Sequence, residues 1–258
     1  MLFLQFIING LITGGAYALI GIGLTLVLGI MHVVNFAHGE MYMLAGYFLY
    51  TCFSLMGINF FASMILAIAG VMLIGFICEK IILKPMRGRS IETVFMALLG
   101  VSLFLQNMVM LIWTPVPQAI KNPFPSQAYI LGGLYFIPQR IAVICLALLL
   151  VLLTHLLLKK TKLGKAMRAT FLDREAALLM GINSDRIYSY TFTLGSGLAA
   201  ASGALLGPIF TVNPYVGNLA NLKAFSIVII GGLGSFPGAV AAGLLLGVFE
   251  SLGAAYVS

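Results

Sequence analysis

Long apolar runs separated by short polar breaks make up most of this 258-residue chain. Seven runs are long enough to cross a bilayer as helices, because a transmembrane helix needs roughly 20 apolar residues. They are 2–30, 41–57, 60–78, 91–113, 140–158, 187–207 and 240–257. An eighth run, 222–233, is too short for a straight crossing. The pattern predicts an all-α fold in which 1–258 form a single transmembrane domain. The predicted fold is that of a polytopic helical membrane protein with about eight transmembrane or partly spanning helices, some of them broken.

Four of the breaks between the runs hold polar or helix-breaking residues and few basic ones. HVVNFAHGE at 32–40 follows the first run, and GGLGSFPGA at 231–239 divides the last two. The segment 114–139 holds five of the nine prolines and is predicted to be a loop. The polar segment 208–221 is predicted to be a second loop. The N-terminus has neither a basic stretch nor a signal-peptidase-like site, so the first run is predicted to stay in the membrane.

Composition supports the membrane assignment and argues against a soluble domain. Only 8% of the residues are charged and 61% are hydrophobic, whereas a soluble domain carries about 25% charged residues. The 29 glycines suit close packing of membrane helices. The three cysteines, Cys52, Cys78 and Cys145, lie in separate apolar runs. This spacing indicates small buried side chains, neither a disulfide framework nor a metal site.

Positive charge is concentrated in two segments that flank the runs. The segment 79–89 carries Lys80, Lys84, Arg87 and Arg89 beside Glu79. The segment 159–186 holds seven of the fourteen basic residues and three of the seven acidic ones. The net charge of +7 therefore follows the positive-inside rule and does not indicate nucleic-acid binding.

The two basic segments also predict the orientation of the chain. Two runs separate 79–89 from 159–186, so both segments can face the cytoplasm. The segments 114–139 and 208–221 then face outside. Counting back through three runs places the N-terminus outside as well.

The segment 159–186 has a helical pattern of its own. Leu163, Ala166, Met167, Thr170 and Phe171 recur at the spacing that gives one mostly apolar helix face. The intervening basic residues lie off that face. The segment is therefore predicted to begin with a short amphipathic helix outside the bilayer.

A second short helix is predicted to follow. Asp173 is a suitable N-cap for 174–180, and Gly181 suits the position just past the helix end. Asn183 or Ser184 can cap the start of the next span. The pattern alone leaves two roles open. The helices can lie on anionic lipid headgroups, or they can provide a handle for a soluble partner.

Several motifs in these segments resemble motifs of known protein families. Glu175-Ala176-Ala177, three residues and then Gly181 resemble the E-A-A-x-x-x-G loop of ABC-importer permeases. Other segments resemble the branched-chain amino-acid permease family, in particular its LivH-type subunit, and they occur in order from about residue 5 to residue 257. They are INGLITGGAYALIGIGLTLVLGI (8–30), NFAHGE (35–40), GKAMRA (164–169), MGIN (180–183), TF (191–192), GGLGSFPGA (231–239), Gly243 and Gly247.

The resemblance implies a permease subunit in the bacterial cytoplasmic (inner) membrane, without ATPase activity of its own. It implies a second permease subunit, two cytoplasmic ATPase subunits docked on E-A-A loops, and an extracytoplasmic substrate-binding protein that delivers leucine, isoleucine or valine. It further implies that the ATPase contact includes Arg168, Asp173, Glu175, Ala177 and Gly181. Members of the family usually continue past YVS at 256–258 into another span, so a truncated or shortened chain is expected.

Polar residues within the apolar runs are the remaining candidates. Asn35, His38 and Glu40 surround Gly39, and ionisable groups inside a membrane are costly enough to suggest function. They are candidates for the translocation pathway, with a hydrogen-bonded structural cluster as the alternative. Glu250 lies between glycines and suits close helix packing as well as transport. Lys223 can extend towards the interface.

The sequence predicts no enzyme chemistry. GGLGS lacks the lysine and the context of a phosphate-binding loop. Neither a Walker motif nor a Ser/His/Asp or zinc-type arrangement occurs. We therefore expect no catalytic residue, no metal and no cofactor. Two alternatives stay open: a urea or short-amide permease of the same family, and a secondary carrier or channel in which Glu40 or Glu250 couples protons.

Overall fold

The computed structural model describes residues 2–125, 127, 129–131 and 134–256, and most of them are helical. The helices are α1 (Leu2–Met31), α2 (His38–Leu49), α3 (Phe60–Cys78), α4 (Ile91–Trp113), α5 (Pro138–Lys160), α6 (Lys162–Leu172), α7 (Arg174–Leu179), α8 (Ser184–Leu206), α9 (Val216–Gly231) and α10 (Phe236–Tyr256). The π-helical segment η1 (Tyr50–Leu55) extends α2, and η2 (Glu79–Leu83) and η3 (Lys84–Met86) extend α3. The prediction of a polytopic helical membrane protein is confirmed.

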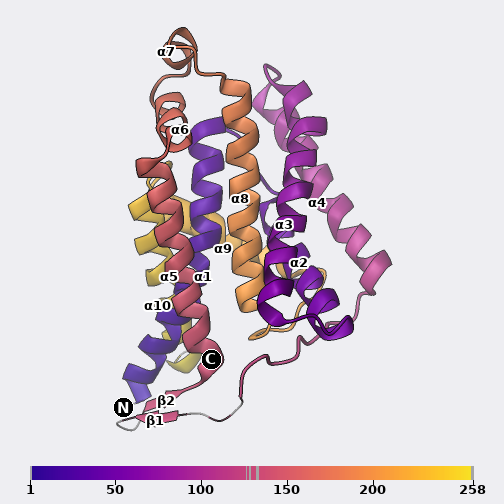
Figure 1. Ribbon diagram of the computed structural model, residues 1–258, viewed down its shortest axis with the longest axis vertical. Helices are drawn as coiled ribbons and strands as arrows, with labels where there is room; N and C mark the ends of the chain where they lie inside the picture. Colours follow the sequence, from indigo (N-terminus) through magenta and orange to yellow (C-terminus); the bar gives the residue numbers. More distant parts are fainter. Residues whose placement is uncertain (1, 126, 128, 132–133, 257–258) are drawn as a thin grey trace.

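The long helices lie side by side and give the molecule two distinct ends (Figure 1). One end carries α6 and α7. The other carries the start of α1 and an antiparallel hairpin of β1 (Tyr129–Leu131) and β2 (Leu134–Phe136). The predicted loop 114–139 and the N-terminal end of α1 therefore share one end, opposite the segment 159–186, as their predicted topology requires. Residues 126, 128 and 132–133 of that loop and residue 257 of the last predicted run lie outside the described residues.

Small residues bring α1 and α10 into close contact. Gly10 and Gly14 on α1 face Gly243 and Gly247 on α10, so each helix presents a pair of glycines four residues apart. A Cβ atom at Gly10 would lie 2.6 Å from the Cα atom of Val248, and one at Gly14 would lie 2.9 Å from the carbonyl oxygen of Gly243. Membrane helices associate through such stripes because small residues let the backbones approach.

The helix α8 fills the centre of the bundle beside α1 (Figure 1). Its side chains are mostly Gly, Ala, Ser and Thr, and nearly all of its second half is buried. Ser202 donates a hydrogen bond from Oγ to the carbonyl oxygen of Ala16 on α1, at 2.7 Å. Among the described residues, five helices meet both the length and the hydropathy expected of a membrane span: α1, α3 with its extension, α4, α5 and α10. A core position explains why α8 needs less hydrophobic surface than these helices.

Some predicted boundaries are wrong, and for the start of α9 burial explains why. The helix α9 begins at Val216, so the predicted loop 208–221 ends before it and the short run 222–233 is only the second half of the helix. Gly217 and Asn221 are buried against the start of α2. The polar character of this segment indicated a loop in water, but neighbouring helices of the bundle provide the partners for its polar groups. Likewise, α3 continues helically to Met86 through the first part of the predicted basic loop.

Candidate functional site

The first short helix of the charged segment is amphipathic as predicted, and it packs onto the end of the bundle. The hydroxyl of Thr161 caps α6 by accepting a hydrogen bond from the amide of Gly164, at 3.0 Å. Met167 and Thr170 are buried on the predicted apolar face. Lys162, Lys165 and Arg168 are exposed. The amphipathic pattern therefore buries one face of α6 against protein and leaves the basic face free.

The last residue of that apolar face, Phe171, reaches the turn between α9 and α10. Its ring is so close to Gly234 that a Cβ atom there would lie 2.6 Å from two ring carbons. Gly29 of α1 lines the same place, because its own Cβ atom would lie 3.3 Å from the ring. Gly234 also has φ = +76°, which favours glycine. The helix α6 is thus in direct contact with the turn that joins two other helices.

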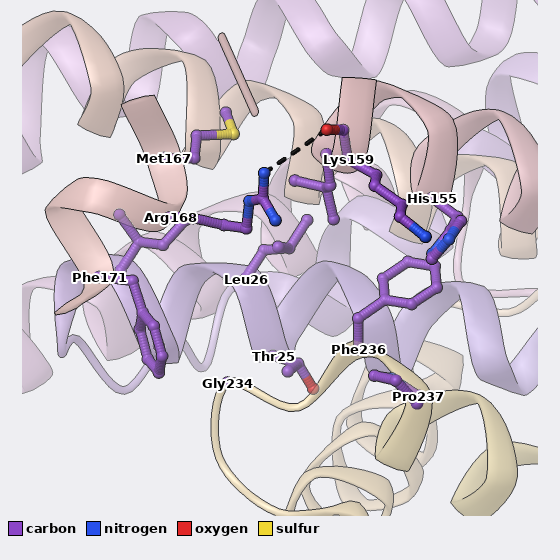
Figure 2. Close-up of a pocket in the computed structure, with 13 residues that line it drawn as sticks. Thr25, Leu26, His155, Lys159, Met167, Arg168, Phe171, Gly234, Phe236 and Pro237 are labelled. Atoms are coloured by element: carbon purple, nitrogen blue, oxygen red, sulfur yellow. Dashed lines mark hydrogen bonds between the residues drawn. The ribbon is translucent and has the colours of Figure 1, made fainter. Parts of the chain in front are cut away.

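Beside this contact is a cavity of about 320 Å³ between α1, α5, α6 and the start of α10. Figure 2 shows Arg168 pointing into it from α6, with Phe236 and His155 on the far side. The Arg168 guanidinium donates a hydrogen bond to the carbonyl oxygen of Lys159, at 3.5 Å. The predicted contact residue Arg168 therefore bridges α6 and the last turn of α5.

Asp173 separates α6 from α7 and caps the second helix, as predicted. Its Oδ1 atom accepts hydrogen bonds from the amides of Glu175 and Ala176, at 2.9 and 3.0 Å. A carboxylate at this position satisfies otherwise unpaired amides and complements the positive end of the helix.

Gly181 ends α7 in the way the sequence predicts. Its φ is +81°, and its amide donates to the carbonyl oxygen of Leu178 at 3.0 Å. The next amide, that of Ile182, donates to the carbonyl oxygen of Ala177, also at 3.0 Å. These two bonds define a Schellman motif, which requires a left-handed residue. Asn183 then caps α8 by accepting from the amide of Arg186, at 3.1 Å.

The surface of α7 is apolar and unusually exposed. Leu179 is 89% exposed and Met180 is 83% exposed, and Leu172 before the helix is 82% exposed. Glu175 is exposed beside them, whereas Ala177 is buried. Of the predicted contact residues, Arg168 and Glu175 thus offer accessible side chains. Asp173 and Gly181 shape the backbone of the loop, and Ala177 packs beneath it.

An ion-pair cluster that sequence reasoning missed joins the two basic segments. The carboxylate of Glu79 is fully buried and is paired with Arg87. Arg87 also pairs with Asp185 at the start of α8, at 2.5 Å. The guanidinium groups of Arg87 and Arg174 lie 5.1 and 5.6 Å from the ring centre of Tyr188. Glu79 looked like one charge in a solvated loop, and only the packing of α8 reveals that it is enclosed.

The polar residues Asn35, His38 and Glu40 are brought together at the start of α2, and all three are fully buried. The ring of His38 places Nε2 3.0 Å from the carbonyl oxygen of Ile20 on α1. Glu40 accepts a hydrogen bond at Oε1 from the hydroxyl of Ser102 on α4, at 3.0 Å. Because α2 begins inside the bundle, these side chains link its first turn to two neighbouring helices.

A fourth polar residue, Asn221 of α9, completes this cluster. Its Oδ1 accepts a hydrogen bond from the amide of Gly39 at 2.7 Å, and its Nδ2 donates to the carbonyl oxygen of Phe36. Asn221 therefore pairs two backbone groups where α2 begins, which is the requirement for irregular backbone at membrane depth. One signal for it was available in the sequence, an Asn at the edge of an apolar run. Sequence reasoning assigned this residue to a loop.

In the described part of the chain, no group of three or more His, Cys, Asp or Glu side chains lies close enough together to hold a metal ion.

Similarity to known proteins agrees with this geometry. Residues 6–258 match the family described as branched-chain amino acid transport system / permease component. The chain is 37% identical to the high-affinity branched-chain amino acid transport system permease protein BraD of Pseudomonas aeruginosa, over 98% of this chain and 86% of that protein. It is 36% identical to the corresponding permease protein LivH of Escherichia coli, over 99% and 87%. A probable branched-chain amino acid transport permease protein LivH of Methanocaldococcus jannaschii is 30% identical, over 95% and 79%. No solved structure matches significantly.

Proposed function

This chain belongs to the permease-component family of branched-chain amino acid transport systems, and from that premise we propose its role. It is a membrane subunit of an ATP-binding-cassette importer that carries branched-chain amino acids across the cytoplasmic membrane. The observation that carries the proposal is the unit formed by α6 and α7 at one end of the bundle (Figure 1). It projects the E-A-A-x-x-x-G segment away from the membrane helices.

The exposed residues of α7 support docking of a soluble protein. Leu179 and Met180 are each more than four-fifths exposed, and Glu175 lies beside them. An apolar surface of this kind, flanked by charged residues, is typical of a protein interface. We propose that an ATPase subunit covers it, and that Arg168 and Glu175 contribute polar contacts at its rim. A second permease, a second ATPase and an external binding protein complete the proposed assembly, and ATP is hydrolysed outside this chain.

The contact between α6 and the α9–α10 turn supports a route for the energy. A movement of the docked ATPase would shift α7 and α6 together, because only the Asp173 cap separates them. Phe171 would pass that shift to Gly234, and hence to α9 and α10. Tightly packed elements transmit such displacements because their cores resist compression.

For the pathway we propose that Asn35, His38 and Glu40 line a passage that opens when α9 moves away from α2. Glu40 supports this role because its carboxylate borders Gly217 of α9, where a Cβ atom would lie 2.8 Å from Cδ of Glu40. Three buried polar side chains at membrane depth are costly and are by default candidates for function.

Photo-crosslinking tests the docking surface. A benzoylphenylalanine residue at Leu179 should form an adduct with the ATPase subunit in membranes that contain the whole transporter. The same residue at Val116, which is 61% exposed in the segment that follows α4, provides the control and should give no such adduct. An active transporter that gives no adduct from Leu179 would show that α7 is not the docking helix.

A further inference from the structure

A second charged group lies outside the segment 159–186, where α9 and α10 meet α1. The ammonium of Lys223 on α9 is 2.7 and 2.9 Å from the two carboxylate oxygens of Glu250 on α10. It also donates a hydrogen bond to the hydroxyl of Tyr17 on α1, at 2.6 Å. The three side chains, called here the Lys223 triad, come from three different helices.

The position of the Lys223 triad within the bundle makes its exposure informative. Tyr17 is in the middle of the thirty-residue helix α1. Lys223 follows the start of α9 by seven residues, roughly 10 Å along a helix axis. The side chains of Lys223 and Glu250 are nevertheless 29% and 46% exposed. Charges exposed at membrane depth are strongly disfavoured in contact with hydrocarbon, so they are expected to face a water-filled passage or protein.

The structure provides a cavity of about 270 Å³ at this place. Lys223 and Glu250 give one wall its charges beside the hydroxyl of Tyr17, and Thr211 and Asn213 add polar groups from the preceding loop. The rest of the wall is mostly apolar: Ile20, Phe210, Val216, Leu219 and Ala220, together with Tyr42. Opposite charges thus stand beside a hydrophobic surface in one cavity.

We propose that the Lys223 triad binds the zwitterionic head group of an amino acid in transit. The substrate carboxylate pairs with the Lys223 ammonium, and the substrate ammonium pairs with the Glu250 carboxylate. One ion pair within the protein is exchanged for two between protein and substrate, so every charge keeps a partner. The aliphatic side chain lies against the apolar wall. The inference rests on the proposed function, since it specifies what the imported substrate must carry.

The same chemistry distinguishes the two kinds of substrate that the sequence left open. A free amino acid presents one positive and one negative group a few ångströms apart, which matches the charges of Lys223 and Glu250. Urea and short amides carry no net charge on any group and cannot replace either partner of a broken ion pair. The Lys223 triad therefore favours amino acids.

The experiment uses the complete transporter in proteoliposomes, with leucine-loaded binding protein at saturating concentration. It compares ATP-driven uptake of leucine with ATP hydrolysis stimulated by the binding protein. The variants are Lys223→Met, Glu250→Gln, Tyr17→Phe and the exchange Lys223→Glu/Glu250→Lys. Lys121→Met, at an exposed lysine in the loop 114–139, is the matched control.

The inference predicts that Lys223→Met and Glu250→Gln reduce uptake by about tenfold or more, because each leaves one substrate charge unpaired. Tyr17→Phe should reduce uptake by about two- to fivefold, since it removes one hydrogen bond. The exchange variant should stay defective, because its charges are in the wrong places for the substrate. Stimulated ATP hydrolysis should persist in all of them, and Lys121→Met should behave as wild type.

Three results would overturn the inference. Uptake that recovers in the exchange variant would show that the pair only fastens α9 to α10. Uptake and ATP hydrolysis that fall in proportion would show a role in assembly. Unchanged uptake in the single variants would show no role. Failure of the proposed function is seen separately, as a wild type that imports no branched-chain amino acid. If that wild type imports another zwitterion, the same variants are tested with that substrate. If it imports urea, the inference is wrong as well.

Discussion

The ring of Phe171 in α6 packs against Gly234 in the turn between α9 and α10. Gly234→Ala should therefore uncouple ATP hydrolysis from uptake. Its φ of +76° costs a side chain about 1–2 kcal/mol, and displacing the ring adds about 1–3 kcal/mol of overpacking. We expect uptake to fall several-fold while the protein still inserts. Uptake and ATP hydrolysis in the same proteoliposomes measure this.

A double variant separates the two causes. Phe171→Ala removes the ring, so Gly234→Ala should cost less uptake in that background than in the wild type. Equal losses in both backgrounds would show that the ring and the turn do not communicate.

Gly181 allows a sharper test of the loop geometry. Gly181→Val should impair coupling because a β-branched residue at φ = +81° breaks the Schellman motif. Open space surrounds the position, so the strain comes from the backbone alone. Gly181→Asn is the control, since Asn adopts this conformation more readily. We expect uptake about tenfold lower for Val than for Asn, at equal amounts of protein in the membrane by immunoblot. Normal uptake by the Val variant would contradict the argument.

The buried ion pair between Glu79 and Arg87 predicts a loss of stability. Glu79→Gln should lower the free energy of unfolding by about 3 kcal/mol, because Arg87 loses its enclosed partner. The thermal unfolding midpoint of the purified protein in detergent measures the change. Lys84→Gln, on an exposed side chain in the same segment, should leave the midpoint unchanged. Similar midpoints for Glu79→Gln and wild type would mean that the pair does not hold α3 to α8.

Asn221 and Glu40 should respond differently to substitution. Asn221→Ala leaves the amide of Gly39 and the carbonyl of Phe36 unpaired, at a cost of about 1–3 kcal/mol. Its unfolding midpoint should therefore fall. Asn218→Ala, on the exposed face of the same helix, should not change it.

Glu40→Gln, by contrast, keeps an oxygen that can accept from Ser102. If Glu40 serves the passage, uptake should fall several-fold with little change in the midpoint. A midpoint that falls together with uptake would assign Glu40 to the structural cluster.

Local rules were enough to predict the helices and caps of the segment 159–186. The caps at Asp173, Gly181 and Asn183 depend on backbone groups within a few residues, so their geometry follows from short stretches of sequence. The apolar face of α6 follows from its period. The run lengths similarly predicted the membrane helices, because bilayer thickness sets them.

Long-range packing was beyond the same rules. The start of α9 was assigned to a loop because Asn221 is polar, and its partners lie about 180 residues away along the chain. Glu79 and Arg87 were read as solvated charges, although α8 encloses them. The charge partners Lys223 and Glu250 were recognised singly, and only the meeting of α9 and α10 makes them a pair. Periodicity reveals which face is buried, but not which residues meet there.

Uptake of leucine with and without an active ATPase decides whether this chain depends on ATP hydrolysis for transport. The transporter is reconstituted in liposomes with its binding protein, and with either the wild-type ATPase subunits or variants that bind ATP but cannot hydrolyse it. We predict accumulation only with the active ATPase, and none in its absence whatever proton gradient is imposed. Accumulation that persists without hydrolysis would contradict the account and show that this chain transports on its own.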